Sequence, residues 1–250
     1  MKIAVVTGGS RGLGRNASLR LAEKGVDIIF TYNSNIDEAN KTVKEIEALG
    51  RKAVALQLNT GHVQTFENFS KELSKKLSEK FGTQKFDYLL NNAGMALYQP
   101  FMESTEEQFD DIMNVHLKGV FFLTQKLVPL MNDGGKILNV SSGLARFSLP
   151  GSSVYGCMKG AVEVLSRYLA VELGARGITV NTIAPGAIET DFGGGRVRDN
   201  KEMNGFIASQ TALGRAGKPD DIGEIMAELL AGNMTWINGQ RIEASGGFRL

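Results

Sequence analysis

The sequence predicts an α/β fold of the Rossmann type, in which helices cover both faces of a doubly wound parallel sheet. Apolar segments of strand length alternate with amphipathic segments of helix length along the whole chain. The strand-like segments show little apolar–polar alternation, as expected when both faces of the sheet are covered. No Pro/Ser-rich linker and no repeat divides the 250 residues, so we expect one domain spanning residues 1–250.

Each element can be assigned in chain order from its periodicity and from the glycine or proline at its ends. Strands are expected at Lys2–Thr7, Val26–Tyr32, Ala53–Leu58, Phe86–Leu90, Lys136–Val140, Ile178–Ile183 and Gln240–Glu243. Helices are expected at Arg11–Lys24, Ile36–Leu49, Val63–Lys80, Glu106–Met131, Val154–Arg176 and Pro219–Leu230. Only Phe192–Leu213 shows no clear period. In such a sheet the ligand binds beyond the carboxyl ends of the strands, where the motifs below fall.

The composition argues against several classes of function. The formal net charge is +1 and no long run of like charge occurs, so nothing points to nucleic acid or an anionic membrane as a partner. No apolar run reaches the roughly 18 residues that span a bilayer, and the first residues already predict a strand rather than a secretory leader. A cytoplasmic location is therefore expected. The single cysteine, Cys157, cannot form an internal disulfide, and no metal site is expected.

The turn between the first strand and the first helix is rich in glycine. Gly8, Gly12 and Gly14 would let the backbone approach a ligand, and the N–H groups at the helix start favour a phosphate. The spacing is G-x3-G-x-G rather than the commoner G-x-G-x-x-G, and a plain tight turn is the alternative. The predicted dinucleotide contacts are Thr7, Gly8, Ser10, Arg11, Gly12, Leu13 and Gly14.

The end of the second strand indicates which dinucleotide is preferred. Enzymes that prefer NAD usually carry Asp or Glu there, bonded to the ribose 2′-OH. Here the strand ends Thr31-Tyr32-Asn33-Ser34, and the next carboxylate is Asp37. The missing carboxylate, together with Arg11 in the glycine turn, favours NADP(H) with Asn33 and Ser34 as contacts. Use of NAD(H) stays open, as does an ordinary solvated role for Arg11.

A proton-transfer set is predicted from Ser142, Tyr155 and Lys159. Tyr155 and Lys159 lie one helical turn apart and share a face. The ammonium would lower the pKa of the phenol from its usual value of about 10 and make the phenol a better acid or base near neutral pH. The Ser142 hydroxyl, at a strand end, could polarise a carbonyl oxygen. Alone, Tyr-x3-Lys is weak evidence, because an exposed helical pair has the same spacing.

Together these motifs make the chain resemble the short-chain dehydrogenase/reductase family, in its classical branch. The resemblance covers nearly the whole sequence. The matching segments are TGGSRGLG at 7–14, NNAG at 91–94, MNVHLKG at 113–119, ILNVSS at 137–142, YGCMK at 155–159, NTIAPGAIET at 181–190 and INGQRIEASGG at 237–247.

The resemblance implies a catalytic tetrad of Asn114, Ser142, Tyr155 and Lys159. Tyr155 would be the acid for carbonyl reduction and the base for alcohol oxidation. Lys159 would hold the nicotinamide ribose and depress the tyrosine pKa. Ser142 would polarise the substrate oxygen, and Asn114 would hold a water in a proton relay to Lys159. The family also places further residues along the cofactor: Asn91, Ala93, Gly94, Pro185, Gly186, Ile188 and Thr190.

One position departs from the family pattern. After the third strand the family commonly has Asp followed by Val or Leu, and this carboxylate bonds the adenine amino group. This chain has Asn59-Thr60 there. The Asn59 side-chain oxygen could accept the same bond, so we expect a weakened rather than a lost adenine contact.

Three neighbours of the tetrad are not expected to act. Ser141 is expected to be structural, because the thirteen-residue offset to Tyr155 selects Ser142. His116 and Cys157 lie two residues from tetrad members on helices, so they would face elsewhere. His116 is expected to pack or to be solvated, and Cys157 to be a small buried residue.

The substrate end is expected to be mostly apolar. Residues that flank the tetrad or its loops are candidates to line it: Leu144, Met95, Phe147, Phe192 and Met158, with Arg146 and Arg196 as anionic contacts. Residues 191–213 correspond to the substrate-covering loop of the family, with Gly193–Gly195 as a hinge; simple disorder is the alternative.

We therefore expect an NADP(H)-preferring oxidoreductase that interconverts a carbonyl and a secondary alcohol by hydride transfer, mainly as a reductase of a 3-oxoacyl thioester or another ketone. An NAD-dependent alcohol, polyol or sugar dehydrogenase is the alternative. A non-catalytic dinucleotide sensor would not need the tetrad, and an enoyl reductase would place the lysine further from the tyrosine. The resemblance suggests a homotetramer or homodimer built through the helices at 106–131 and 154–176.

Overall fold

The computed structural model describes all of residues 1–250, and its centre is one seven-stranded parallel sheet. The strand order is β3-β2-β1-β4-β5-β6-β7, which confirms the predicted Rossmann-type arrangement. The strands are β1 (Lys2–Val6), β2 (Val26–Tyr32), β3 (Ala53–Gln57), β4 (Phe86–Asn91), β5 (Met131–Val140), β6 (Thr179–Pro185) and β7 (Arg241–Ala244). The order reverses between β1 and β4, so a crevice at the carboxyl edge is expected beside these two strands.

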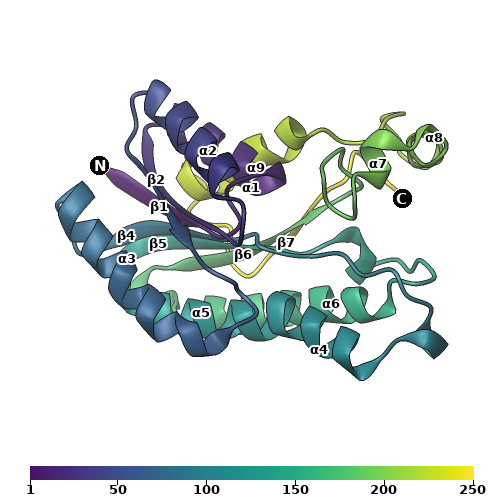
Figure 1. The fold of residues 1–250 in the computed structure, drawn as a ribbon, viewed down its shortest axis with the longest axis horizontal. Helices are drawn as coiled ribbons and strands as arrows, with labels where there is room; N and C mark the ends of the chain where they lie inside the picture. Colours follow the sequence, from purple (N-terminus) through teal and green to yellow (C-terminus); the bar gives the residue numbers. More distant parts are fainter.

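Helices cover both faces of this sheet (Figure 1). One face carries α1 (Gly12–Glu23), α2 (Ile36–Ala48) and α9 (Pro219–Ala231), and the other carries α3 (Phe66–Phe81), α4 (Glu106–Met113), α5 (Gly119–Leu127) and α6 (Ser153–Glu172). Short 3-10 turns lie at Val63–Thr65, Phe101–Glu103, Val128–Leu130, Gly143–Ala145 and Gly174–Arg176. No helix is both long and apolar enough to cross a membrane.

Two apolar cores hold the layers together, one on each face of the sheet. Leu21 of α1 and Met226 of α9 belong to one core, and Leu73 of α3 and Leu127 of α5 belong to the other. All four side chains are fully buried. The nearly continuous apolar runs of the central strands serve both cores, which is why their sequences lack alternation.

The predicted helix at Glu106–Met131 is wrong in detail, because the structure divides it. A π-helical turn at Asn114–Lys118 separates α4 from α5, and β5 begins at Met131. The chain passes so close to the loop after β3 that a Cβ on Gly119 would overlap the Thr60 carbonyl oxygen. A π turn inserts one residue into a helix and rotates the side chains that follow it, and such turns are frequent at functional sites.

The segment without a clear period also contains regular structure. Residues 192–213 include α7 (Arg196–Asp199) and α8 (Lys201–Ser209). The Asn200 side chain caps α8 by accepting a hydrogen bond from the Met203 N–H at 2.9 Å. Helices this short leave little periodic signal in the sequence. In Figure 1 they lie at the carboxyl end of the sheet, where the site is expected.

Candidate active site

The glycine turn is built for close backbone approach. A Cβ on Gly14 would overlap the Gly8 carbonyl oxygen, so only glycine fits there. Helix α1 starts at Gly12, its N-cap residue Arg11 makes no side-chain cap, and no acidic residue lies in the first turn. The first N–H groups of α1 therefore have no side-chain acceptor. This arrangement fits the pyrophosphate of a dinucleotide.

Hydrogen bonds to the Thr7 hydroxyl connect this turn to the end of β4. The Thr7 hydroxyl accepts from the Asn92 N–H at 2.9 Å and from the Ala93 N–H at 3.0 Å. The Gly8 N–H donates to the Thr31 hydroxyl of β2 at 3.1 Å. Three neighbouring strands therefore hold the loop in one position.

Most of the predicted cofactor residues gather at this edge. Thr7, Thr60, Asn91 and Ala93 line one small cavity with Val115 and α5. A Cβ on Gly12 would come within 3.9 Å of Thr190, so the segment after β6 faces the glycine turn. Pro185 ends β6, and the Gly186 N–H donates to Ala244 of β7 at 3.1 Å. The cofactor role of these residues stays a prediction.

Some of the predicted cofactor-binding residues also make hydrogen bonds or packing contacts within the protein. The buried Asn91 amide donates to Thr124 at 2.9 Å and to Asn139 at 2.8 Å. Ser10 is buried, and its carbonyl accepts from the Thr42 hydroxyl. Leu13 and Ile188 pack against the core beside α1. These residues therefore shape the loops, whatever they contribute to a ligand.

The end of β2 fits a phosphorylated ribose. Asn33 and Ser34 are exposed, and no carboxylate stands beside them until Asp37 in the first turn of α2. Arg11 is exposed and forms no ion pair. A free guanidinium suits a 2′-phosphate better than a 2′-OH.

The Asn59 side chain makes a hydrogen bond within the protein that the sequence did not indicate. Its side-chain oxygen accepts a hydrogen bond from the Gly61 N–H at 2.9 Å, which closes the turn after β3. A carbonyl oxygen has a second lone pair, so an adenine contact stays a prediction.

Ser142, Tyr155 and Lys159 come together at the end of β5. The Lys159 Nζ lies 5.4 Å from the centre of the Tyr155 ring and donates to the Val140 carbonyl at 2.6 Å. Ser142 is the second residue after β5, and its side chain faces the Tyr155 phenol. The three residues that the sequence spacing selected therefore lie close together, and their catalytic roles stay a prediction.

Burial controls the protonation of this group. Burial raises the pKa of Tyr155 above its usual 10, and the Ser142 side chain opposes that rise. Burial lowers the pKa of Lys159 from 10.5 to about 7. The expected lowering of the tyrosine pKa by Lys159 is not seen, because desolvation dominates for both groups. Tyr155 is thus a neutral phenol at neutral pH, the form that can donate a proton.

Behind the group, Ser141 is structural, as predicted. Its hydroxyl donates to the Glu163 carboxylate at 2.6 Å, and Glu163 is paired with Arg241 at 2.7 Å. Arg241 also contacts Glu243, which is paired with Arg146. A chain of charges therefore joins β5, α6 and β7 beneath the site.

Asn114 and His116 both lie in the π turn between α4 and α5. Asn114 lies close to Gly61, which belongs to the loop after β3. His116 is 1% exposed, and its ring meets the Tyr155 ring edge-on at 5.1 Å. Sequence reasoning set His116 aside on the assumption of ordinary helix geometry, which the π turn invalidates. The tetrad role of Asn114 stays a prediction.

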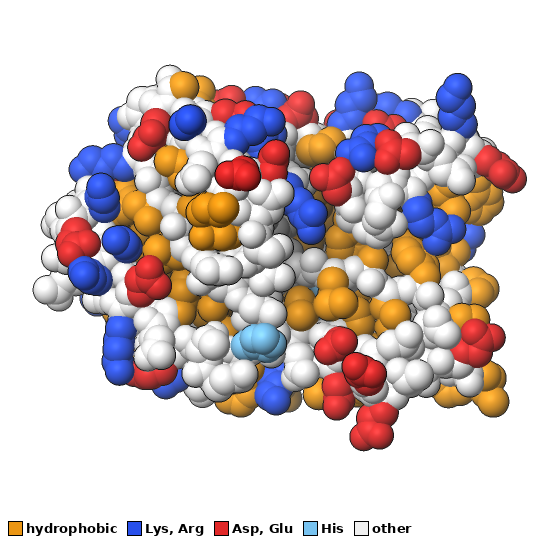
Figure 2. Space-filling model, viewed as in Figure 1, with side chains coloured by type: hydrophobic (Ala, Val, Ile, Leu, Met, Phe, Trp, Pro, Cys, Tyr) orange, Lys and Arg blue, Asp and Glu red, His pale blue; other side chains and the backbone are white.

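The substrate side is apolar at its rim. Met95 and Phe192 are 40% and 44% exposed, and the Phe192 ring centre lies 6.1 Å from that of Tyr155. Figure 2 shows hydrophobic side chains gathered on this face between the two helical layers. Leu144 is half-buried beside Ser142, whereas Met158 is buried.

Two expectations near the site are wrong. Arg146 is not free to bind an anionic substrate, because it forms a two-bond pair with Glu243 and donates to the carbonyls of Phe248 and Arg249. Cys157 is exposed rather than buried. Phe147, which the sequence also suggested, packs against Phe248, 5.2 Å between ring centres.

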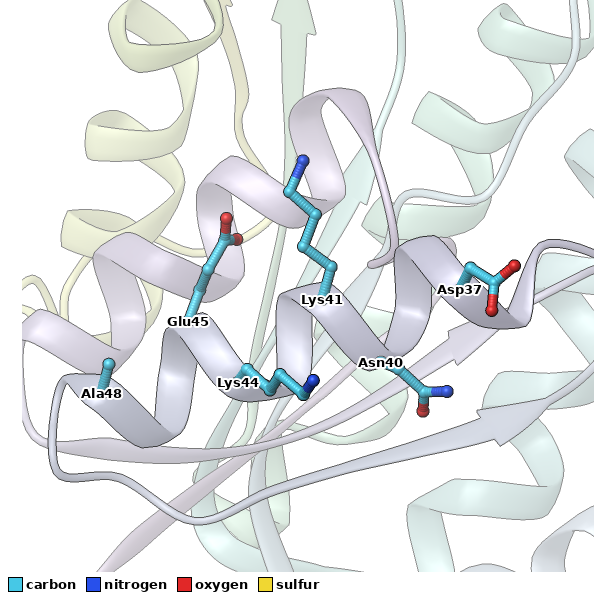
Figure 3. A pocket seen from close by; sticks show the side chains of 6 residues that line it. All are labelled: Asp37, Asn40, Lys41, Lys44, Glu45 and Ala48. Atoms are coloured by element: carbon cyan, nitrogen blue, oxygen red, sulfur yellow. The ribbon is translucent and has the colours of Figure 1, made fainter.

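A separate hollow lies on the outer surface of α2, away from these residues (Figure 3). Six side chains of this one helix line it: Asp37, Asn40, Lys41, Lys44, Glu45 and Ala48. It is a charged, open helix surface, and we assign no ligand to it.

Comparison with known proteins agrees with this geometry. A family model described as Enoyl-(Acyl carrier protein) reductase matches residues 8–249. The chain belongs to the short-chain dehydrogenase/reductase family. It is therefore an NAD(P)-dependent oxidoreductase of that family. Tyr155 and Lys159 are only four residues apart, the spacing that argued against an enoyl reductase.

Three similar proteins are reductases of different substrates. The 3-oxoacyl-[acyl-carrier-protein] reductase FabG of Staphylococcus epidermidis is 36% identical over 98% of each chain. The promiscuous reductase LugOII, which catalyses keto-reduction at C1 during lugdunomycin biosynthesis, has a TM-score of 0.94 at 36% identity, covering 100% of this chain and 98% of its own. The angucycline C-6 ketoreductase LanV with bound NADP has a TM-score of 0.94 at 34% identity, covering 99% and 95%.

Proposed function

We propose that this protein reduces a ketone to a secondary alcohol with NADPH. The observation that carries the proposal is the grouping of Ser142 and Lys159 around a half-buried, neutral Tyr155 phenol. A phenol that keeps its proton can donate it to the substrate oxygen, which is the proton transfer that carbonyl reduction requires. Bound NADPH would supply the hydride.

Each member of the group has one role in this reduction. The Tyr155 O–H donates its proton to the substrate oxygen as that oxygen gains negative charge. The Ser142 hydroxyl donates a hydrogen bond to the same oxygen and polarises the carbonyl. Lys159, fixed by Val140, offers its remaining N–H groups to the nicotinamide ribose.

The preference for NADPH rests on the end of β2 and on Arg11. The absence of a carboxylate at Asn33 and Ser34 removes repulsion of a 2′-phosphate, and Arg11 supplies a free positive charge. The relative LanV was crystallised with NADP, which supports the same preference. An NAD-dependent alcohol, polyol or sugar dehydrogenase is the alternative.

The apolar rim favours a bulky, uncharged ketone. Tyr98, Met95 and Phe192 are all at least two-fifths exposed around Tyr155. Arg146, which could have bound an anionic group, is occupied by Glu243. Polycyclic ketones, such as those implied by the names of LugOII and LanV, and 3-oxoacyl thioesters, as for FabG, are the two substrate classes to compare.

We also propose one NAD(P)-binding domain over residues 1–250, within which residues 191–213 cover the substrate. Assembly into a homodimer or homotetramer would use α4, α5 and α6. Exposed apolar side chains on these helices support this: Phe109, Phe121, Phe122, Val164, Tyr168 and Val171. Sedimentation of the purified protein tests the assembly. The cytoplasmic location stays a prediction.

The direct test of function is a substrate screen that follows NADPH absorbance. Bicyclic and polycyclic ketones, acetoacetyl thioesters, enoyl thioesters and polyols are offered with NADPH, NADH or their oxidised forms. Turnover of a ketone with NADPH is the expected result. Turnover of enoyl thioesters alone, or of polyols with NAD alone, would contradict the proposal.

A further inference from the structure

Two charged residues of the last strand lie beside the segment that carries Ser142. Arg241 and Glu243 are two positions apart in β7, so their side chains share one face of the sheet. Arg241 donates a hydrogen bond to Glu243 at 2.8 Å. The two side chains are only 22% and 18% exposed. This face of the edge strand therefore carries a half-buried ion pair.

Arg241 contacts the start of that segment. Its Nη2 donates to the Ser142 carbonyl oxygen at 3.4 Å, and its Nε donates to the Glu163 carboxylate at 2.7 Å. The same Glu163 oxygen accepts from the Ser141 hydroxyl at 2.6 Å. Glu163 lies one helical turn after Lys159 on α6. The pair of Arg241 and Glu163 therefore holds residues 141 and 142 against the helix that carries Lys159.

Glu243 holds the other end of the segment. Its two carboxylate oxygens accept from Arg146 at 2.7 Å and 2.8 Å. Between the two ends, the Ser142 hydroxyl accepts from the Leu144 N–H at 3.2 Å. That bond uses a lone pair of the hydroxyl, so its hydrogen can still be donated to another group. Residues 141–146 are thus connected to β7 at both ends, with the Ser142 hydroxyl between them.

The geometry of Arg241 is better suited to fixing a position than to adding stability. Partly buried ion pairs contribute little net stability, because the desolvation of the charges offsets much of their attraction. A guanidinium, however, donates from three nitrogens in one rigid plane. Here each nitrogen has a different acceptor: Nε contacts Glu163, Nη1 contacts Glu243 and Nη2 contacts the Ser142 carbonyl oxygen. Only one arrangement of the segment satisfies all three.

We propose that Arg241 is a positioning residue, which acts through the backbone of Ser142 and fixes the Ser142 hydroxyl for its hydrogen bond to the substrate oxygen. Glu163 and Glu243 orient the guanidinium. A hydrogen bond that stabilises a transition state depends on a preorganised donor, and a small displacement of that donor lowers the rate. The proposal rests on the proposed function, since Ser142 serves the same reduction.

The test is a double-mutant cycle on kcat for a ketone, built from Arg241→Met and Ser142→Ala. Met resembles the aliphatic part of Arg and has no N–H donor. We expect Arg241→Met to lower kcat about tenfold when Ser142 is present and less than about twofold when it is Ala, with the Kd for NADPH unchanged. Arg20→Met is the matched control and should keep the wild-type kcat, since Arg20 is 28% exposed and also pairs with two carboxylates, Glu23 and Asp220. Equal losses of kcat in both backgrounds, or no loss in either, would overturn the proposal.

A second variant separates position from stability. Arg241→Met alone leaves Glu163, which is 13% exposed, without its cation, and the Tm should fall. Adding Glu163→Met removes the unpaired charge, so the Tm should recover toward that of wild type. We expect kcat to stay about tenfold low in this double variant; a kcat that recovers together with the Tm would overturn the proposal. Wild-type inactivity on every ketone would instead contradict the proposed function.

Discussion

The Arg196 guanidinium lies 5.1 Å from the centre of the Tyr98 ring. This contact joins helix α7 to the segment after β4, on the two sides of the apolar rim. A Cβ on Gly193 would also come within 3.5 Å of the Tyr98 ring. The two segments thus touch next to Phe192, whose ring centre lies 6.1 Å from that of Tyr155. A substrate that enters over this rim would have to part them.

Removing the Arg196–Tyr98 contact should change substrate binding more than chemistry. An exposed cation–π contact contributes about 0.5–1 kcal/mol, so Arg196→Ala should change the KM for the ketone by roughly twofold to fivefold, with kcat changed less. Steady-state kinetics measures this. Lys201→Ala on the neighbouring helix α8 is the control, since Lys201 is exposed and forms no ion pair. A KM equal to that of the control would show that the contact does not hold the rim.

Arg11 should discriminate between the two nicotinamide cofactors. Loss of a hydrogen bond between charged groups costs about 1.5–3 kcal/mol, so Arg11→Ala should weaken NADPH binding by roughly tenfold or more. NADH lacks the phosphate, and its Kd should stay unchanged. Titration with nicotinamide fluorescence gives both constants, with Lys44→Ala on the exposed side of α2 as control. Equal weakening of both cofactors would assign Arg11 to the pyrophosphate instead.

Gly14→Ala should abolish dinucleotide binding. The added Cβ would overlap the Gly8 carbonyl oxygen, which is backbone and cannot swing aside. The glycine turn must then open, and the N–H groups at the start of α1 move away from the ligand. Gly160→Ala in α6 is the control, because a Cβ there meets no atom within 4 Å. Calorimetric titration should detect NADPH binding in the control only; binding by Gly14→Ala would contradict the assigned phosphate site.

The ion pairs of Glu243 should make the stability of the fold decrease at acidic pH. Its partner Arg146 first, and then Arg241, hold the pKa of this carboxyl at about 2, below its ordinary 4.5. Because the folded-state pKa is depressed, this stabilisation is complete above pH 4.5 and is lost as the pH falls toward 2. Between pH 6 and pH 3 the Tm of wild type should fall more than that of Glu243→Gln. Glu47→Gln, at an exposed unpaired carboxyl, should follow wild type. Parallel curves for wild type and Glu243→Gln would exclude this linkage.

The sequence predicted the doubly wound parallel sheet and the choice of Ser142, Tyr155 and Lys159, because these depend on local periodicity and on short spacings along the chain. It could not predict the π turn at Asn114–Lys118, since a one-residue insertion hardly alters the apolar pattern. The position of His116 depends on that turn: its burial confirms the expectation that it packs, but its contact with Tyr155 could not be predicted from the spacing.

Contacts between distant residues were the second source of error. Arg146 looked like a free cation because its partner Glu243 is 97 residues away. The lowering of the tyrosine pKa by Lys159 was expected from charge alone, whereas burial of both side chains sets their pKa values. Neither burial nor a long-range ion pair is visible in the spacing of a motif.

The most direct test of the account is the rate of NADPH oxidation by a ketone in wild type and in Tyr155→Phe. Phe keeps the ring against His116 but removes the hydroxyl that donates the proton. We predict a loss of kcat of at least about 10²-fold, with the Kd for NADPH unchanged. Tyr168→Phe, at an exposed tyrosine of the same helix, should keep the wild-type rate. Retained turnover in Tyr155→Phe would contradict the assignment of Tyr155 as the proton donor.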